Sequence, residues 1–300
     1  MAAKTRLLPQ RIPARKSGVT VGVTQRQARW KFVRFAVHQL APGSRWRSAT
    51  RNEEVCLVLL QGACDVECEG RRYALGPRTD VFSGYPHAIY LPRDAAFTVV
   101  AGPMTHIAEC AAPAKKRFPI RVIRPQDCGF EIRGGGNATR QIVDILPPAF
   151  PADRLMICEV YTPAGNWSSY PPHKHDRDAP PVEADLDETY YYRFREKDAF
   201  GVQRLYGPKD RPDVTLTVRD GELVLVRDGY HPFVAAHGFD AYYLNVLAGS
   251  RRSMAASDDP RYAPFRDRWP APDPRVPIVA PPYSPTSPPL PSWAVPSPGM

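Results

Sequence analysis

The chain has 300 residues, 43% of them hydrophobic, which is enough for one large or two small domains, each with a core. Its formal net charge is +9, yet residues 1–35 hold nine Lys or Arg and no acid, so the rest of the chain is balanced. The positive charge therefore belongs to an N-terminal arm. No aromatic platform or recognition helix accompanies it, so it does not indicate a nucleic-acid-binding face. No apolar run approaches the ~20 residues of a membrane span.

The six cysteines form no CxxC pair, and we expect buried thiols that behave as small hydrophobic side chains at positions 56, 64, 68, 110, 128 and 158. The basic N-terminal stretch has no apolar segment of the kind found in secretory signals, so the expected compartment is the cytoplasm. We expect this arm to be solvated or to clasp another subunit.

Short runs of strand-forming residues follow the arm, interrupted by Gly62, Gly70, Gly76 and Pro92. In the first half they cover 30–40, 55–60, 64–69, 71–75, 87–91, 97–100 and 106–110. Residues 111–137 mix Pro, Gly and charge and predict a connector. A second series covers 140–146, 155–161, 189–194, 201–206, 214–218, 222–226 and 242–247. Many short strands without a long helical period predict an all-β fold, a sandwich or small barrel.

The C-terminal segment differs in composition from both halves. Twelve of the residues from Pro270 to Met300 are Pro, with Ser interspersed. Such a composition buries little apolar surface, so we expect an extended, flexible tail rich in polyproline II conformation, and we expect removal of residues 271–300 to leave metal content and activity largely intact.

One stretch carries most of the chemistry. His173 and His175 share a face of a strand, and Glu188 opens an aromatic run. Further on, Gly229 and Pro232 bracket His231 in a turn. Imidazoles with a carboxylate suit a first-row divalent metal. The sequence predicts four ligands, His173, His175, Glu188 and His231, with Glu183, Asp185 and Asp187 as nearby alternatives to Glu188. A closed zinc site that only staples the barrel is the competing interpretation.

The two halves show a faint internal correspondence. Residues 43–46 precede the Glu54 strand much as residues 165–167 precede the Glu188 strand. The first half has no HxH ahead of Glu54, so we expect it to be structural and without metal. Its histidines, His38, His87 and His106, are scattered, and we interpret them as ordinary strand residues.

Longer strings make the chain resemble a known family. AGNWSSYPPHKHD, ETYYYRF, FGVQRLY, VLVRDGYHP and YYLNVLAG, together with EEVCLVLL and RGGGNATRQIVDILP, look like the 5-deoxy-glucuronate isomerases of bacterial myo-inositol catabolism. The resemblance runs from about Trp30 to about Pro260. It implies two tandem cupin (jelly-roll) barrels. The expected organisation is a basic arm at 1–28, a metal-free barrel at 29–115, a connector at 116–139, a metal-binding barrel at 140–260 and a Pro-rich tail at 261–300.

The resemblance also implies an activity, the aldose–ketose isomerisation of 5-deoxy-D-glucuronate to 5-dehydro-2-deoxy-D-gluconate. The implied cofactor is a divalent metal ion, zinc or manganese, and the implied partner is a small sugar acid, with no nucleic acid or membrane. A homo-oligomer is left open. The alternatives are another metal-dependent cupin, such as a uronate isomerase or an iron-dependent dioxygenase, and a non-enzymatic sugar-binding bicupin.

Four further residues are candidates for the reaction itself. Tyr190 and Tyr192 share the face of Glu188, and Tyr243 lies on the last strand, although each could equally be core packing. Arg204 is the first candidate for pairing with the substrate carboxylate, with Arg193 second. One departure from the family pattern is Arg227-Asp228, where a proline usually precedes the His231 turn. We interpret it as a softened turn that keeps its ligand.

Overall fold

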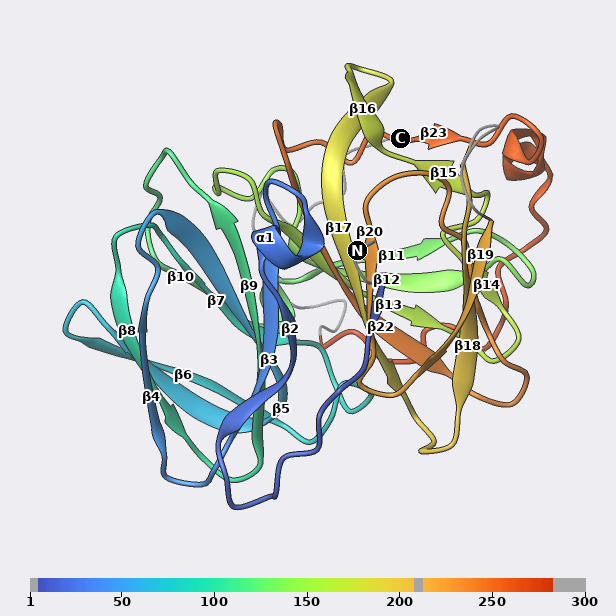
Figure 1. Ribbon diagram of the computed structural model, residues 1–300. Coiled ribbons are helices and arrows are strands. Elements are labelled where there is room, and N and C mark those ends of the chain that lie inside the picture. The colour runs from blue at the N-terminus through green and yellow to red at the C-terminus, as the bar shows by residue number, and fades with distance from the viewer. Residues whose placement is uncertain (1–4, 208–212, 283–300) are drawn as a thin grey trace.

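The computed structural model describes residues 5–207 and 213–282, and consists mostly of strands arranged as two barrels side by side (Figure 1). The expectation of an all-β fold with two tandem barrels is confirmed. The described helices are short: α1 (Gln25–Ala28), η1 (Pro125–Asp127) and η2 (Ala263–Arg268). None of the helices in these residues is long and apolar enough to cross a membrane.

The first barrel is built from a nine-stranded sheet around β5, which pairs with β6, β7, β8 and β9. Its strands are β2 (Gly18–Val23), β3 (Arg34–Leu40), β4 (Arg45–Ala49), β5 (Glu53–Cys68), β6 (Arg71–Arg78), β7 (His87–Leu91), β8 (Ala96–Ala101), β9 (Thr105–Pro113) and β10 (Arg121–Ile123). The continuous apolar run in β5 has both faces buried. Val55 and Leu57 face the barrel interior, whereas Cys56 and Val58 face the second barrel.

The second barrel combines an eight-stranded and a four-stranded sheet. The larger sheet contains β1 (Arg6–Leu7), β11 (Gly129–Arg133), β12 (Arg140–Leu146), β13 (Met156–Thr162), β16 (Asp176–Ala179), β17 (Glu183–Phe194), β20 (Leu223–Val226) and β22 (Ala241–Gly249). The smaller contains β14 (Trp167–Ser168), β18 (Phe200–Leu205), β19 (Val214–Arg219) and β21 (Phe233–Ala235). A further pair joins β15 (His173–Lys174) to β23 (Ser257–Asp258).

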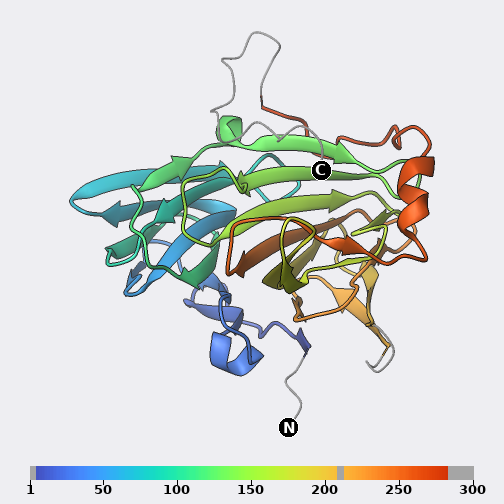
Figure 2. The same cartoon turned by 90° about the horizontal axis from the view of Figure 1, so that it is seen from above.

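The two barrels share one core, which lies between their large sheets. Phe35, Val58 and Tyr90 from the first barrel pack in the same cluster as Tyr161 and Tyr242 from the second. Both ribbon views place β2 to β10 (blue to blue-green) and β11 to β22 (green to orange) on opposite sides of this interface (Figures 1 and 2), while β1 lies with the second barrel. Each large sheet therefore buries the face that points away from its own barrel by packing against the other barrel.

A buried ion pair crosses the same interface. Both Nη atoms of Arg78 on β6 lie 2.8 Å from the carboxylate of Glu159 on β13. Tyr161 and Tyr242 donate their hydroxyls to this carboxylate at 2.8 and 2.9 Å. The pair is satisfied on both sides, which is the condition under which a buried charge is tolerated.

The N-terminal arm differs from the expectation of a solvated or subunit-clasping segment. Its β1 pairs with β20 of the second barrel, and its β2 pairs with β3 of the first. Thr24 caps α1 with a reciprocal capping box to Gln27. The prediction relied on charge, but alternating Val19, Val21 and Val23 supply a strand with a buried face.

The connector and the tail also carry structure. The connector predicted at 116–139 contains β10, which pairs with β7, and β11, which pairs with β12. In the tail, Val279 is only 4% exposed, and its backbone exchanges two hydrogen bonds with the Gln141 side chain, of 2.7 and 3.1 Å. The predicted flexible tail is therefore wrong for residues 270–282. Residues 283–300 lie outside the described part of the chain.

Candidate metal centre

The residues between the HxH and Glu188 form a hairpin. Strand β16 pairs antiparallel with the start of β17, matching Asp176 to Asp185, and the Leu186 amide donates to the His175 carbonyl at 3.0 Å. Because the chain folds back on itself, His175 lies beside Glu188 despite their separation in sequence. The hairpin formed by residues 176–187 thus places two predicted ligands together.

His231 reaches the same point from a tight turn. Gly229 has φ of +77°, and a Cβ at this position would lie 2.4 Å from the Tyr206 carbonyl oxygen, so only glycine fits. The Gly229 amide donates to Asp176 at 2.8 Å, which ties the turn to the β16–β17 hairpin. Arg227, at the position of the usual family proline, donates to the Ala28 carbonyl at 2.7 Å.

Three donors meet at this point. Ligand atoms of His175, Glu188 and His231 all lie within 4.8 Å of one another, and all three residues are buried. A Glu188 carboxylate oxygen is 2.8 Å from His175 Nε2 and 3.2 Å from His231 Nε2. The His173 ring lies edge-on to His231, with 4.9 Å between ring centroids. Among residues 5–207 and 213–282 this is the one such group of His, Cys, Asp or Glu donors.

The backbone fixes how the three imidazoles face. Nδ1 lies 3.2 Å from the Pro171 carbonyl in His173, 3.2 Å from Leu186 in His175 and 3.0 Å from Gly229 in His231. If each Nδ1–H donates to its carbonyl, each Nε2 keeps a free lone pair, as in metal-ligating histidines. The Nε2 of His231 is buried and forms no hydrogen bond within the described residues. This donor set fits a divalent metal ion.

The charges of the group reinforce one another. Burial opposes ionisation of Glu188, but His231, His175 and the Asn245 amide outweigh it and lower its pKa to about 2. Burial lowers the pKa of His231 and also, with the neighbouring imidazoles, that of His173. Burial acts in the same direction on His175, but contact with Glu188 raises its pKa overall. The site is therefore an ionised carboxylate among imidazoles, two of which favour the neutral form.

The three alternative acids lie elsewhere. Glu183 accepts from Lys174 Nζ at 2.7 Å, and Asp187 accepts from the Lys31 and Phe32 amides at 3.0 and 2.6 Å. Asp185 pairs with Asp176 across the hairpin. Of the four carboxylates, only Glu188 belongs to the donor group.

The aromatic candidates line the barrel beside the donors. The Tyr190 ring lies 4.6 Å from Tyr243 and 6.0 Å from His231, and its hydroxyl is 2.8 Å from Ser169 Oγ. Tyr192 donates to the Gln203 amide oxygen. Burial raises the pKa of Tyr190 well above its usual value, so this phenol stays protonated and can act as a hydrogen-bond donor. Among the three candidate tyrosines, Tyr190 is the one whose ring packs against a donor residue, His231.

A cavity of about 440 Å³ lies next to two of the segments that carry the predicted ligands. Pro172 and Pro232, the chain neighbours of His173 and His231, line it, together with the aromatic residues Trp167, Tyr170, Tyr262, Phe265 and Trp269. Arg204 also lines it, but its Nε lies 2.9 Å from Asp213, and its guanidinium stacks 4.2 Å above the Tyr206 ring. Arg193, the second candidate, pairs with Asp220 at 2.7 Å. Both candidate arginines thus have an acidic partner.

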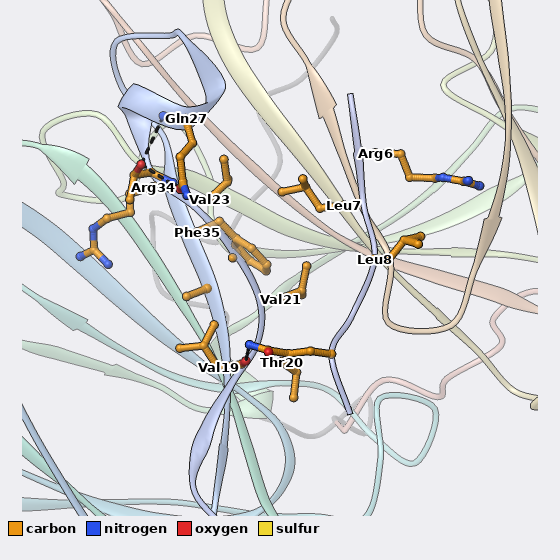
Figure 3. Close-up of a pocket in the computed structure, with 14 residues that line it drawn as sticks. Arg6, Leu7, Leu8, Val19, Thr20, Val21, Val23, Gln27, Arg34 and Phe35 are labelled. Carbon is orange, nitrogen blue, oxygen red and sulfur yellow. Dashed lines mark hydrogen bonds between the residues drawn. The ribbon is translucent and has the colours of Figure 1, made fainter. Parts of the chain in front are cut away.

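A larger cavity, about 700 Å³, lies between β1 and β2, away from the donor group. Leu7 and Val21 flank it from these two strands, and Phe35 lies behind them on β3 (Figure 3). Its described lining residues include no His, Cys, Asp or Glu, so it offers none of the donors of the metal centre.

Sequence reasoning did not single out Arg140, Ser169 or the supporting role of Asn245. The Asn245 amide donates to Glu188 Oε1 at 2.6 Å, and Arg140 shares the inward face of β12 with Ile142. The alternation of β12 was the available signal for Arg140. Which contacts the buried guanidinium makes depends on distant residues such as Tyr170 and Trp269.

Comparison with known proteins agrees with this architecture. The model of the KduI/IolB family matches residues 7–265. A protein of Geobacillus kaustophilus named 5-deoxy-glucuronate isomerase is 43% identical over 256 residues, covering 85% of this chain and 92% of its own length. The protein of the same name from Bacillus subtilis strain 168 is 38% identical over 243 residues, covering 80% and 90%.

Solved structures agree as well. The crystal structure of an IolB-like protein from Salmonella typhimurium has a TM-score of 0.84 at 33% identity and covers 88% of this chain and 100% of its own. Bacillus subtilis oxalate decarboxylase, at 11% identity and a TM-score of 0.59 over 86% and 80%, shares the cupin fold alone. With a family model matching most of its length and close relatives covered almost end to end, this chain belongs to the KduI/IolB family.

Proposed function

We propose that this protein is a 5-deoxy-glucuronate isomerase, which converts 5-deoxy-D-glucuronate to 5-dehydro-2-deoxy-D-gluconate. The observation that carries the proposal is the buried group of His175, Glu188 and His231 beside an aromatic cavity. It occurs in a chain 43% identical, over most of both lengths, to a protein bearing that name. Fold alone would not support an activity, since cupin barrels serve several chemistries.

The proposed ligands are His173, His175, Glu188 and His231, and the proposed ion is zinc or manganese. Held by these residues, such an ion would supply Lewis acidity that polarises the substrate carbonyl and makes the C–H of the neighbouring hydroxyl-bearing carbon more acidic. This is the chemistry that an aldose–ketose isomerisation requires. The site offers nitrogen and carboxylate donors without thiolates, which suits both metals.

The surrounding residues have separable tasks in this proposal. Asn245 holds one Glu188 oxygen, which orients the other toward the imidazoles. The protonated Tyr190 phenol, positioned by Ser169, can donate a hydrogen bond to a substrate oxygen. Tyr243 packs against Tyr190, and Tyr192, two residues further along β17, packs against Tyr243. A narrow aromatic wall limits water around the reactive carbons.

The test combines metal analysis with an NMR assay on 5-deoxy-D-glucuronate. We expect about one zinc or manganese ion per chain, and turnover without oxygen, since an isomerase needs no oxidant. A requirement for oxygen would indicate the dioxygenase alternative. A metal-loaded protein that binds sugar acids without converting them would indicate the non-enzymatic one. Close to two ions per chain would contradict a metal-free first barrel.

The remaining expectations concern the setting of the enzyme. Its partner is a small sugar acid, and a homo-oligomer is to be tested by light scattering. All six cysteines are buried free thiols, as is usual in reducing compartments, so the cytoplasm remains the expected location.

A further inference from the structure

Arg140 is a buried guanidinium of the second barrel. Its residue is 4% exposed, and Nη1 donates to the Ala138 and Tyr170 carbonyls at 3.1 and 3.0 Å. Within residues 5–207 and 213–282, no carboxylate oxygen lies within 4.0 Å of its nitrogens. It therefore carries a charge into the interior without the counter-ion that such a charge normally requires.

Among the described residues Arg78 is the other buried arginine, and Arg193 and Arg252 are partly buried. Arg78 faces Glu159, and Arg193 faces Asp220. Arg252 donates from all three of its guanidinium nitrogens to the carbonyls of Pro147, Pro148, Phe150 and Leu155. Within the described part of the chain, Arg140 donates hydrogen bonds from Nη1 alone. Its remaining donors are available to an anion.

The position of Arg140 relates it to the cavity of the metal centre. Ala138 and Tyr170, whose carbonyls it contacts, line that cavity, and so does Trp269, whose ring centre lies 5.8 Å from the guanidinium carbon. Tyr170 is followed in the chain by Pro171, whose carbonyl lies 3.2 Å from Nδ1 of His173. A chain of contacts thus runs from the guanidinium to the predicted ligand His173.

We propose that Arg140 binds the substrate carboxylate. The inference rests on the proposed function, because the substrate of that reaction carries an aldehyde at one end and a carboxylate at the other. With the carbonyl end at the metal ligands, the carboxylate end extends along the cavity toward a cation. A guanidinium suits this role because its planar fork can donate two parallel hydrogen bonds to a carboxylate.

This assignment differs from the one made on sequence, which favoured Arg204. Arg204 lines the same cavity but is about one-third exposed and already paired with Asp213. To bind substrate it would have to leave that carboxylate. Arg140 is buried, where a charge-assisted hydrogen bond is stronger, and has no acid to displace among the described residues.

The test uses metal-loaded Arg140→Met, Arg140→Lys and Arg204→Met, with Arg251→Met as a control. Arg251 is a surface arginine paired with Asp178 at 2.8 Å. Binding of D-glucuronate and of D-glucose, which has a hydroxymethyl group in place of the carboxylate, is measured by calorimetry. KM and kcat for 5-deoxy-D-glucuronate are measured by NMR, with metal content and melting temperature for every variant.

For Arg140→Met we expect D-glucuronate affinity to fall, and KM to rise, by on the order of 10- to 100-fold. D-Glucose affinity and metal content should match wild type. The melting temperature should hold or rise, since a buried charge without a counter-ion is removed. Arg140→Lys should recover part of the affinity, because it keeps the charge without the fork.

Several results would contradict the proposal that Arg140 binds the substrate carboxylate. One is an unchanged KM in Arg140→Met with a raised KM in Arg204→Met. Another is equal loss of D-glucose and D-glucuronate binding. If Arg140→Met does not fold, wild-type affinity in Arg140→Lys would reject the bidentate role. D-Glucuronate binding that depends on Arg140, without isomerisation of 5-deoxy-D-glucuronate, would reject the proposed function but support carboxylate binding by Arg140. Wild-type turnover with an unchanged KM in both Arg140 variants would support the proposed function but reject carboxylate binding by Arg140.

Discussion

The Glu188 carboxylate is held by three neighbours at once. Asn245 donates to one oxygen at 2.6 Å, and the other oxygen faces His175 and His231. Without the amide, the carboxylate could rotate away from the imidazoles. We therefore expect metal affinity to depend on a residue that is itself outside the donor group, as is common for buried metal sites.

We predict that Asn245→Leu lowers zinc or manganese affinity by about 10- to 100-fold while the protein stays folded. Leucine has a similar volume but cannot hold the Glu188 oxygen. Affinity is measured by competition with a chromogenic chelator, and folding by circular dichroism. An unchanged affinity would show that the imidazoles alone orient Glu188.

The His231 turn offers a second test at the level of one residue. Gly229→Ala places a methyl group against the Tyr206 carbonyl at a φ of +77° and should cost roughly 1–3 kcal/mol in strain. Metal affinity should fall as the turn shifts His231. Gly238 is the matched control: its φ is +87°, and nothing lies within 4 Å of an added Cβ. Equal metal affinities in the two alanine variants would contradict the role of this turn.

At the scale of elements, the β16–β17 hairpin decides where the ligands meet. At the base of this hairpin, Lys174 forms ion pairs with Asp176 at 2.6 Å and Glu183 at 2.7 Å. Pro180 and Pro181 in this segment are residues that interrupt strands. They lie between the two strands, so they form the turn of the hairpin.

The tail segment is an element whose role changed. Asp273 receives the Asn166 amide at 3.1 Å, and its own amide donates to Thr139 at 2.9 Å. Together with Val279 in the shared core, these contacts fasten residues 270–282 across β12 and the loop before β14. The earlier expectation that removing 271–300 is harmless is therefore withdrawn.

We predict that truncation after Pro270 lowers the free energy of unfolding by at least about 2 kcal/mol, because a core valine and its hydrogen bonds are lost. Truncation after Pro282 keeps every one of these contacts and should match the full chain. Urea unfolding of both truncations and the full chain makes the comparison. Equal stability of the two truncations would show that the segment 271–282 is dispensable.

At the scale of the whole molecule, the barrels are joined by a core and by buried polar contacts. Glu54 accepts hydrogen bonds from the Asp153, Arg154 and Leu155 amides at 2.6–2.7 Å and from the Tyr90 hydroxyl at 2.8 Å. The supposed counterpart of Glu188 thus anchors the loop that leads into β13. Since its neighbours Val55 and Leu57 face the first barrel, Glu54 faces the second.

We predict that Arg78→Met destabilises the protein by about 3–5 kcal/mol, because Glu159 keeps a buried charge without its partner. Both barrels should still unfold in one transition, since they share a core. Urea unfolding followed by tryptophan fluorescence and circular dichroism tests both points. Arg72→Met, which removes an exposed pair with Asp65, should leave the midpoint unchanged. Separate transitions for the two probes would indicate independently folding barrels.

The sequence by itself determined the fold class and the chemistry of the centre. Period-two alternation and closely spaced turn residues are local properties, so they predicted an all-β chain. His173, His175, Glu188 and His231 were selected by residue type and by position on strands and turns. These signals need no knowledge of which strands pair.

Only the tertiary structure decided what depends on contacts between distant segments. The N-terminal arm was judged by its charge, but β1 lies against β20, more than 200 positions away. The tail was judged by its prolines, but Val279 meets Gln141 in the core. Arg204 and Arg140 are equally cationic in sequence, and only packing gives one an acidic partner and leaves the other facing carbonyls. Burial and pairing of a charge are set by the whole fold, because they depend on residues that local sequence does not specify.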